Sequence, residues 1–117
     1  MSFNLHVIMG HVGADPEVRT TTSGKEVMNF RVATNRARKE GDRWVDETDW
    51  HSVVYWEPKG QVDILRKGTQ VLVRGESRER EWTQDDGTRR WKTELHAREI
   101  KLCGSKPQEP GRSREPF

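Results

Sequence analysis

The sequence predicts an all-β domain, a small five-stranded barrel with one short helix. Runs rich in Val, Thr and Trp recur between residues 3 and 102, and Gly, Pro, Asn and Asp residues separate them. Only one segment has helical spacing. With 117 residues and 13.7 kDa, the chain has the size of a single domain. There is room for one core and one principal site.

The composition predicts a thin core. Leu, Ile, Val and Phe account for only 22 of 117 residues, but 21 basic and 19 acidic residues leave a net charge of just +2. Such a low net charge argues against disorder. Because a partner subunit often completes a thin core in a charged chain, we expect an oligomer. Net charge alone does not indicate a nucleic-acid partner, since a basic patch depends on how the fold segregates charges.

Several features predict a soluble, cytoplasmic protein without membrane contacts. No stretch approaches the roughly 18 consecutive apolar residues of a membrane span, and residues 1–12 lack the pattern of a signal peptide. Cys103 is the only cysteine, which excludes an internal disulfide and a thiolate-rich metal site.

The first two strands follow from alternation of apolar and polar residues. In the first strand, which ends near Gly10–Gly13, the alternating apolar residues are Phe3, Leu5, Val7 and Met9. Asp15-Pro16 and Ser23-Gly24 then mark turns. A second, longer strand follows, with an apolar face made of Met28, Phe30 and Val32.

The middle of the chain predicts a loop, a strand and the helix. Residues 35–48 hold four basic and four acidic residues around Gly41-Asp42, which indicates an exposed hairpin or loop. The third strand runs from about Thr48 to Glu57. Pro58 suits a first helical position, Val62 and Leu65 share one face, and Gly68 ends the helix.

Residues 70–83 and 89–102 form the last two strands, an extended hairpin. Asp86-Gly87 favours a two-residue turn, which would place Trp82 opposite Trp91. Five strands with a helix between the third and fourth is the order of an OB-fold, a partly open barrel that binds oligonucleotides and oligosaccharides. Residues 1–103 therefore form the predicted OB-fold domain. Residues 104–117, rich in Pro and Gly, form a short flexible tail.

The third strand carries the first candidate binding surface. Trp50, Ser52, Val54 and Trp56 share one face, while His51, Val53 and Tyr55 share the other. A single Trp on a strand is more often part of the core. Two on one face, with Val53 and Tyr55 available for burial opposite, favour a solvent-accessible surface on which bases could stack.

The last hairpin carries the second candidate surface. One face of its first strand is basic and ends in an indole: Arg74, Arg78, Arg80 and Trp82. On the partner strand, Arg90 and Lys92 flank Trp91. Cations can follow the phosphates of a single nucleic-acid strand while flat rings accept any base, so this pattern predicts sequence-independent binding. The alternative is a solvated, salt-bridged ribbon, because acidic residues are interspersed.

Sequence motifs for catalysis are absent. The four histidines lack metal-ligand spacing, and no nucleophile-elbow, Walker or Rossmann pattern occurs. The Gly10–Gly13 pair resembles a phosphate loop only superficially and is interpreted as a barrel corner. We therefore predict no catalytic residue, no metal and no cofactor.

Six segments occur in an order that resembles one family: residues 10–19 (GHVGADPEVR), 23–25 (SGK), 29–34 (NFRVAT), 48–54 (TDWHSVV), 65–71 (LRKGTQV) and 82–87 (WTQDDG). They resemble the bacterial single-stranded-DNA-binding protein (SSB) family, collinearly from Phe3 to Leu102.

The resemblance implies an OB-fold protomer in a homotetramer that wraps single-stranded DNA, without catalysis, during replication, recombination and repair in the nucleoid. It also assigns residues. Trp50, Trp56 and Trp82 match family aromatics that stack on bases, and Lys67, Arg78 and Arg80 match basic positions near the strand. His51 matches a histidine at the subunit interface. The nearest alternative is a primosomal OB-fold adaptor that acts mainly through protein contacts.

Two departures from the family pattern stand out. The family has an aromatic base-stacker after Ala33-Thr34, whereas this chain has Asn35–Arg38, so Arg38 would stack through its guanidinium and Trp44 would compensate. The tail is short and basic instead of long and acidic. It keeps the terminal Pro116-Phe117, which in the family docks on replication and repair enzymes, so these two residues are candidate partner contacts.

Overall fold

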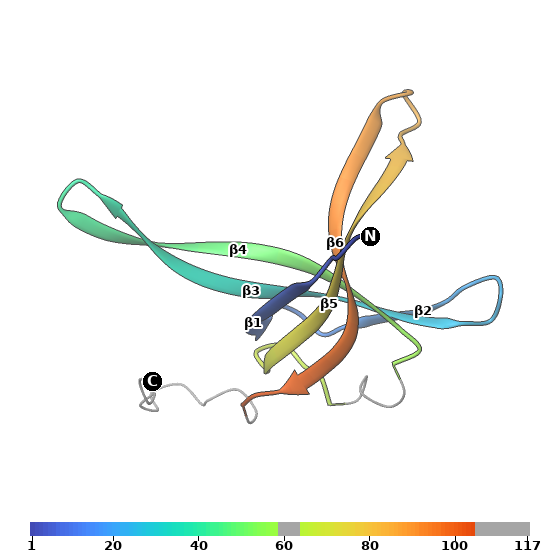
Figure 1. The fold of residues 1–117 in the computed structure, drawn as a ribbon, viewed down its shortest axis with the longest axis horizontal. Coiled ribbons are helices and arrows are strands. Elements are labelled where there is room, and N and C mark those ends of the chain that lie inside the picture. The colour runs from blue at the N-terminus through green and yellow to red at the C-terminus, as the bar shows by residue number, and fades with distance from the viewer. Residues whose placement is uncertain (59–63, 105–117) are drawn as a thin grey trace.

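Five strands close into a barrel in the computed structural model, which describes residues 1–58 and 64–104 (Figure 1). The described residues form six strands, of which β2 is an edge strand and the other five make up the barrel: β1 (His6–Val12), β2 (Glu17–Thr20), β3 (Glu26–Glu40), β4 (Arg43–Trp56), β5 (Gln70–Thr83) and β6 (Arg89–Leu102). They follow the order β1-β5-β6-β4-β3-β2, and a further β1–β3 pairing closes the barrel. Among the described strands, β4 and β6 are the one pair that runs in parallel. The all-β class and the five-stranded OB-fold barrel are thus confirmed.

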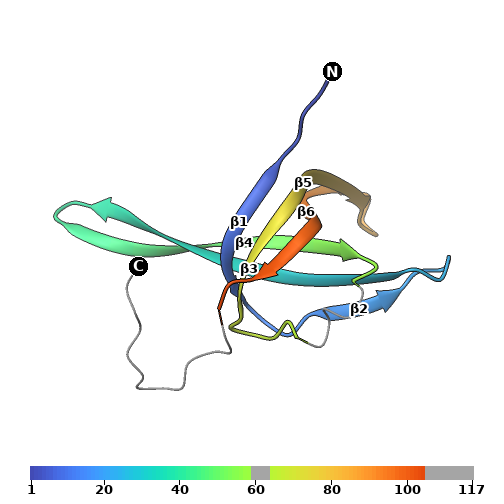
Figure 2. The same ribbon diagram turned by 60° about the horizontal axis from the view of Figure 1, so that its bottom comes forward.

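Two long hairpins project from the barrel in different directions (Figures 1 and 2). One is the β3–β4 hairpin, in which pairing continues to Glu40 and Arg43, so the charged 35–48 segment is a paired arm. The other is the β5–β6 hairpin, whose strand bounds match the prediction. Strand β2 was not expected, and it pairs with the start of β3.

The predicted helix over 58–68 is not found in the part of it that the structure describes. Residues 59–63 lie outside the described residues, and residues 64–69 form turns. Their backbone groups pair with the end of β1 and the residues after it. The Gly68 N–H donates to Val12 O at 2.7 Å, and the Lys67 N–H donates to Asp15 Oδ1 at 2.9 Å. Leu65 is buried in the core, as its spacing predicted.

The predicted register of the β5–β6 hairpin is wrong by one residue. The loop has three residues, 85–87, because the Gly87 N–H donates to Gln84 O at 2.9 Å and the Gln84 N–H donates to Thr88 O at 2.8 Å. Gly87 has a φ of 89°, the left-handed conformation that such a loop requires. Trp82 therefore lies opposite Arg90, and Trp91 opposite Glu81. The two indoles are on different faces of the hairpin.

The core collects one face of each barrel strand. Its most completely buried side chains are Val12, Met28, Val32, Val53, Leu65, Val71, Val73 and Leu95. The faces predicted for the second strand and for Val71 and Val73 are confirmed. In β1 the core face is the one with Ile8 and Val12, while the alternating stripe from Phe3 to Met9 is exposed.

Candidate nucleic-acid interface

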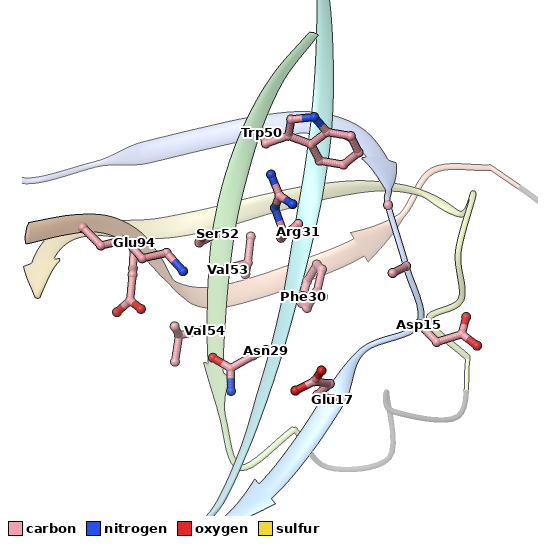
Figure 3. A pocket seen from close by; sticks show the side chains of 13 residues that line it. Asp15, Glu17, Asn29, Phe30, Arg31, Trp50, Ser52, Val53, Val54 and Glu94 are labelled. Carbon is pink, nitrogen blue, oxygen red and sulfur yellow. The ribbon is translucent and has the colours of Figure 1, made fainter. Parts of the chain in front are cut away.

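A groove runs over the outer surface of β3, β4 and β6. It consists of two adjoining hollows of about 370 and 340 Å³, which share Asn29, Val54 and Glu94 as lining residues. Trp50 borders only the first hollow and Trp56 only the second, so the two indoles stand at opposite ends of the groove. Figure 3 shows the first hollow.

The face of β4 predicted to be accessible is the face that lines this groove. Trp50 and Trp56 keep 48% and 45% of their surface exposed. On the other side, Val53 is in the core and Tyr55 packs against it. This division between the two faces of β4 is confirmed, because burial of Val53 and Tyr55 leaves the indoles directed outward.

Two neighbouring residues hold the Trp50 ring. The Arg31 guanidinium carbon lies 4.6 Å from the ring centroid, a cation–π contact. Gly13, the residue after the end of β1, also lies against the ring. Both residues also line the first hollow. Arg31 was not anticipated, although alternation along β3 places it opposite the buried Phe30 and Val32 and therefore on the groove face.

A buried carboxylate lies in the floor of the groove. The Glu94 side chain is only 8% exposed. Its Oε2 accepts a hydrogen bond from Arg80 Nε at 3.1 Å, and its Oε1 lies 3.2 Å from His96 Nε2. The Arg80 guanidinium also lies 5.1 Å from the Trp82 ring centroid. Arg80 thus links the groove to the indole of the β5–β6 hairpin, and its charge compensates Glu94.

The predicted basic residues divide into two classes. Four form ion pairs with carboxylates: Arg38, Arg74, Arg78 and Arg80. The Glu76 carboxylate has a lowered pKa chiefly because Arg78 donates a hydrogen bond to it. Three form no ion pair within the described part of the chain: Lys67, Arg90 and Lys92. Arg19 and Arg31, which were not predicted as site residues, likewise form no ion pair within the described part of the chain. Both border the groove. The alternative of a salt-bridged ribbon is therefore correct for part of the β5–β6 hairpin.

The groove gathers only some of the predicted site residues. Trp50, Trp56, Arg80 and Lys92 line it. Arg78, Trp82 and Arg90 lie on the same face of the β5–β6 hairpin as Arg80: Arg78 is paired opposite Glu94, nearer the barrel, while Trp82 and Arg90 are paired nearer the tip. Trp91 lies on the opposite face of that hairpin, and Arg74 lies beside Val7 of β1. Lys67 lies in the turn before β5, directly before Gly68, whose backbone N–H donates to Val12 O.

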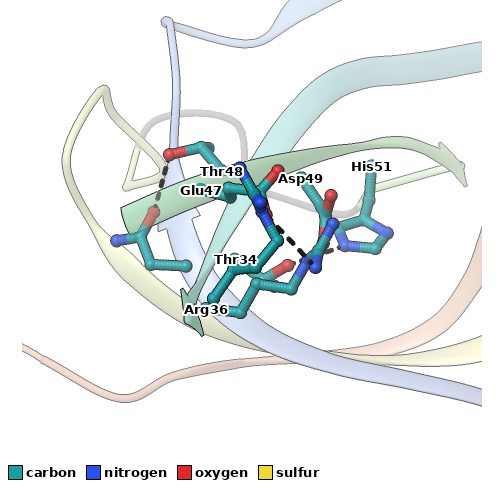
Figure 4. A network of polar contacts seen from close by, with 8 residues as sticks. Thr34, Arg36, Glu47, Thr48, Asp49 and His51 are labelled. Carbon is teal, nitrogen blue, oxygen red and sulfur yellow. Dashed lines mark hydrogen bonds and ion pairs between the residues drawn. The ribbon is translucent and has the colours of Figure 1, made fainter. Parts of the chain in front are cut away.

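The β3–β4 arm is cross-linked by ion pairs (Figure 4). Arg36 Nε donates to Asp49 Oδ2 at 2.8 Å, and Arg38 Nε donates to Glu47 Oε1 at 2.6 Å. Because water screens exposed pairs of this kind, they stabilise the arm only weakly. Arg38 is therefore engaged with Glu47 in this structure. Trp44, opposite Lys39 near the end of the arm, is 68% exposed.

His51 lies at the base of the arm and is half-buried. Its Nε2 is 2.9 Å from Thr34 Oγ1, and its ring meets His6 edge-to-face with a centroid separation of 5.9 Å. Burial lowers the pKa of His6, and the neighbouring His51 lowers it further. The two histidines connect β1 to β4.

Across residues 1–58 and 64–104, no three His, Cys, Asp or Glu side chains are grouped to hold a metal ion. The same residues contain no helix with the length and apolar character to cross a membrane. Pro116 and Phe117, the predicted partner contacts, lie outside the described residues.

Comparison with known proteins shows which family the chain belongs to. The model of the single-strand binding protein family matches residues 3–103. The chain belongs to this family. It is 41% identical to a single-stranded DNA-binding protein of Treponema pallidum, over 85% of this chain and 57% of that one. It is also 35% identical to single-stranded DNA-binding protein 1 of Xylella fastidiosa, over 90% and 80% of the two chains. The chain thus spans little more than half the length of the first relative.

A solved structure shares the fold. It is the Plasmodium falciparum SSB complex with ssDNA, which has a TM-score of 0.80 and 26% identity, and the match covers 89% of this chain and 97% of that chain. The family likeness inferred from the six sequence segments is confirmed.

Proposed function

We propose that this protein binds single-stranded DNA without reading its sequence, and that it acts by binding alone in replication, recombination and repair. The observation that carries the proposal is the pair of half-exposed indoles, Trp50 and Trp56, at the two ends of one groove. Relatives named as single-stranded DNA-binding proteins, and a structural neighbour solved with ssDNA, support it.

The charges around the groove suggest how a strand would lie. Bases would stack on Trp50 and Trp56, while the unpaired cations Arg31 and Lys92 would meet phosphates. Glu94 in the floor would repel phosphates, which favours bases directed inward and the backbone directed outward. From the groove, Arg80 and Trp82 would guide the strand onto the β5–β6 hairpin, with Arg78 and Arg90 as further contacts.

Quenching of tryptophan fluorescence by oligo-dT tests the proposal. Trp50→Ala should weaken binding by about 1–3 kcal/mol, because one stacking platform is lost. Circular dichroism should show that the variant is folded. Unchanged affinity in a folded Trp50→Ala variant would remove the groove from the DNA path. Absence of any quenching in the unaltered protein would favour the primosomal adaptor instead.

We further propose that the protein forms a homotetramer, and the support for this proposal comes from β1 and the residues that precede it. Val7 and Met9 are exposed on the outer face of β1, and Phe3 and Leu5, which precede the strand, are exposed as well. Such a contiguous apolar stripe is typical of a protein contact. The histidine pair of β1 and β4 lies next to it, which is consistent with His51 at a subunit interface.

The remaining proposals concern the tail and the location of the protein. Strand β6 ends at Leu102, which is consistent with a domain boundary at residue 103. Recruitment of replication or repair proteins through Pro116 and Phe117 remains a prediction from the sequence. So does the cytoplasmic, nucleoid-associated location, which follows from DNA binding.

A further inference from the structure

We infer that Gly13 is a positioning residue for Trp50: the lack of a side chain at Gly13 lets the indole lie against the backbone and sets the orientation in which the ring meets a base. The inference rests on the proposed function, because it gives Trp50 a role in DNA binding. Figure 3 shows Trp50 and Arg31 at the first hollow, which Gly13 also lines.

Space, not backbone conformation, explains why this position is glycine. Gly13 is not among the glycines with positive φ, so the backbone there would accept alanine. A Cβ built on Gly13 would lie 2.8 Å from Trp50 Cη2 and closer still to Cζ3. Its three nearest atoms all belong to the six-membered ring of that indole.

The other crowded glycines serve the barrel instead. Cβ atoms built on Gly10 and Gly75 would collide with backbone atoms of Ala33 and His96 on neighbouring strands. These two positions allow strands to approach closely. At Gly13, by contrast, the added Cβ would collide with a side chain of the proposed binding surface.

The backbone at Gly13 is held in place, so an added methyl group must displace the ring. The Gly13 N–H donates to Arg31 O at 2.9 Å, and the Arg31 guanidinium carbon lies 4.6 Å from the Trp50 ring centroid. Gly13 and Arg31 are therefore hydrogen-bonded to each other and both contact the indole; together they form its seat, the surface on which the ring lies. Because the ring is about half exposed, it can move outward toward solvent when the seat is filled.

A double-mutant cycle tests this inference with oligo-dT titrations of Gly13→Ala, Trp50→Ala and the double variant. Trp50→Ala should weaken binding by about 5- to 150-fold. Gly13→Ala should weaken it by at least about threefold, and should have no further effect in the Trp50→Ala background. Additive losses, or full affinity in Gly13→Ala, would overturn the inference. An inert Trp50→Ala would instead contradict the proposed function.

A smaller ring provides a rescue experiment. Phe at position 50 keeps a stacking surface but does not reach as far as the indole atoms nearest to Gly13, so Gly13→Ala should be neutral in the Trp50→Phe background. If Gly13→Ala alone lowers the melting temperature, the double variant Gly13→Ala/Trp50→Phe should restore it. A double variant that binds oligo-dT more weakly than Trp50→Phe alone, or that stays destabilised, contradicts the inference. Gly104→Ala is the matched control, because its Cβ would approach only the Gln70 side chain, at 3.2 Å.

The position of the ring can be followed directly. In protein labelled with 5-fluorotryptophan, Trp50→Phe identifies the Trp50 fluorine resonance. Gly13→Ala should shift that resonance and leave those of Trp44 and Trp91 in place, because both lie outside the groove. Equal shifts of all resonances would indicate a general structural change and overturn the inference.

Discussion

Whether a basic side chain can meet a phosphate depends on the carboxylates around it. Arg74 and Arg80 belong to one face of β5, but Arg74 pairs with Glu99 beside β1 and Arg80 spans Glu94 and Trp82. Lys92, on the neighbouring strand, lines the groove and has no carboxylate partner among the described residues. The sequence identified all three as cations. Their pairing depends on register and strand curvature, which alternation alone does not determine.

The salt dependence of DNA binding should separate these cations. Lys92→Ala should reduce the slope of log affinity against log salt by about 1, because one phosphate contact is lost. Arg74→Ala is the control and should leave the slope unchanged, since Arg74 lies outside the groove. Oligo-dT titrations at several salt concentrations measure both slopes. Equal slopes for the two variants would show that Lys92 does not meet phosphate.

A second residue-scale prediction concerns pH. The pKa of His6 lies below its ordinary value of 6.5, because the ring is partly buried and faces His51. The unfolded chain therefore takes up the proton more readily, and stability should be lost as the pH falls through 6.5 toward the folded pKa. The melting temperature should drop between about pH 7 and 5.5, and His6→Gln should reduce the drop. An equal drop in the variant would rule out His6 as its cause.

At the scale of elements, loop length decides which residues share a face. The strands of the β5–β6 hairpin were predicted with correct bounds, because apolar alternation and the Asp-Gly signal are both local. The register was wrong because Asp86-Gly87 belongs to a three-residue loop, closed by the Gln84–Gly87 hydrogen bond. Neither dipeptide preference nor alternation distinguishes the two loop lengths. Arms such as 35–48 are similarly ambiguous, since charge patterns suit either loops or exposed strands.

The observed register makes Trp82 and Trp91 a matched pair for experiment. Trp82 shares its face with Arg80 and the groove, whereas Trp91 lies opposite Glu81 on the other face. Trp82→Ala should weaken oligo-dT binding by about 1–3 kcal/mol, and Trp91→Ala should have little effect. Both rings are exposed on one hairpin, so the comparison controls for general effects on folding. Equal losses would mean that DNA contacts both faces.

At the scale of the whole molecule, the fold was largely predictable, but which face of β1 is buried was not. The five barrel strands and the core faces of the later ones follow from alternation and turn signals, whereas the short edge strand β2 was not predicted. In β1 both faces carry apolar residues, with Ile8 and Val12 inside and Val7 and Met9 outside. Alternation cannot choose between two apolar faces. The groove was half predictable, because its indoles, and in retrospect Arg31, follow from strand parity, while Gly13 and Glu94 are brought to it by the pairing of strands distant in the sequence.

The exposed stripe of β1 predicts the mass in solution. Sedimentation equilibrium should give an assembly near four times the 13.7 kDa protomer. Val7→Glu should lower this mass, because it places a charge in the proposed contact. Val18→Glu is the matched control, since Val18 is exposed on β2, away from the stripe. A monomeric unaltered protein would refute the proposed homotetramer.

The pairing of β1 also bears on how separated protomers behave. From His6 to Gly10, β1 pairs with β5, while its contact with β3 is limited to His11 and Val12. Within the described part of the chain, the other edge of residues 6–10 therefore keeps open backbone donors and acceptors. An edge of this kind can pair with another chain and is prone to aggregation. A durable monomeric form would consequently require a blocking residue, such as lysine or proline, on that edge.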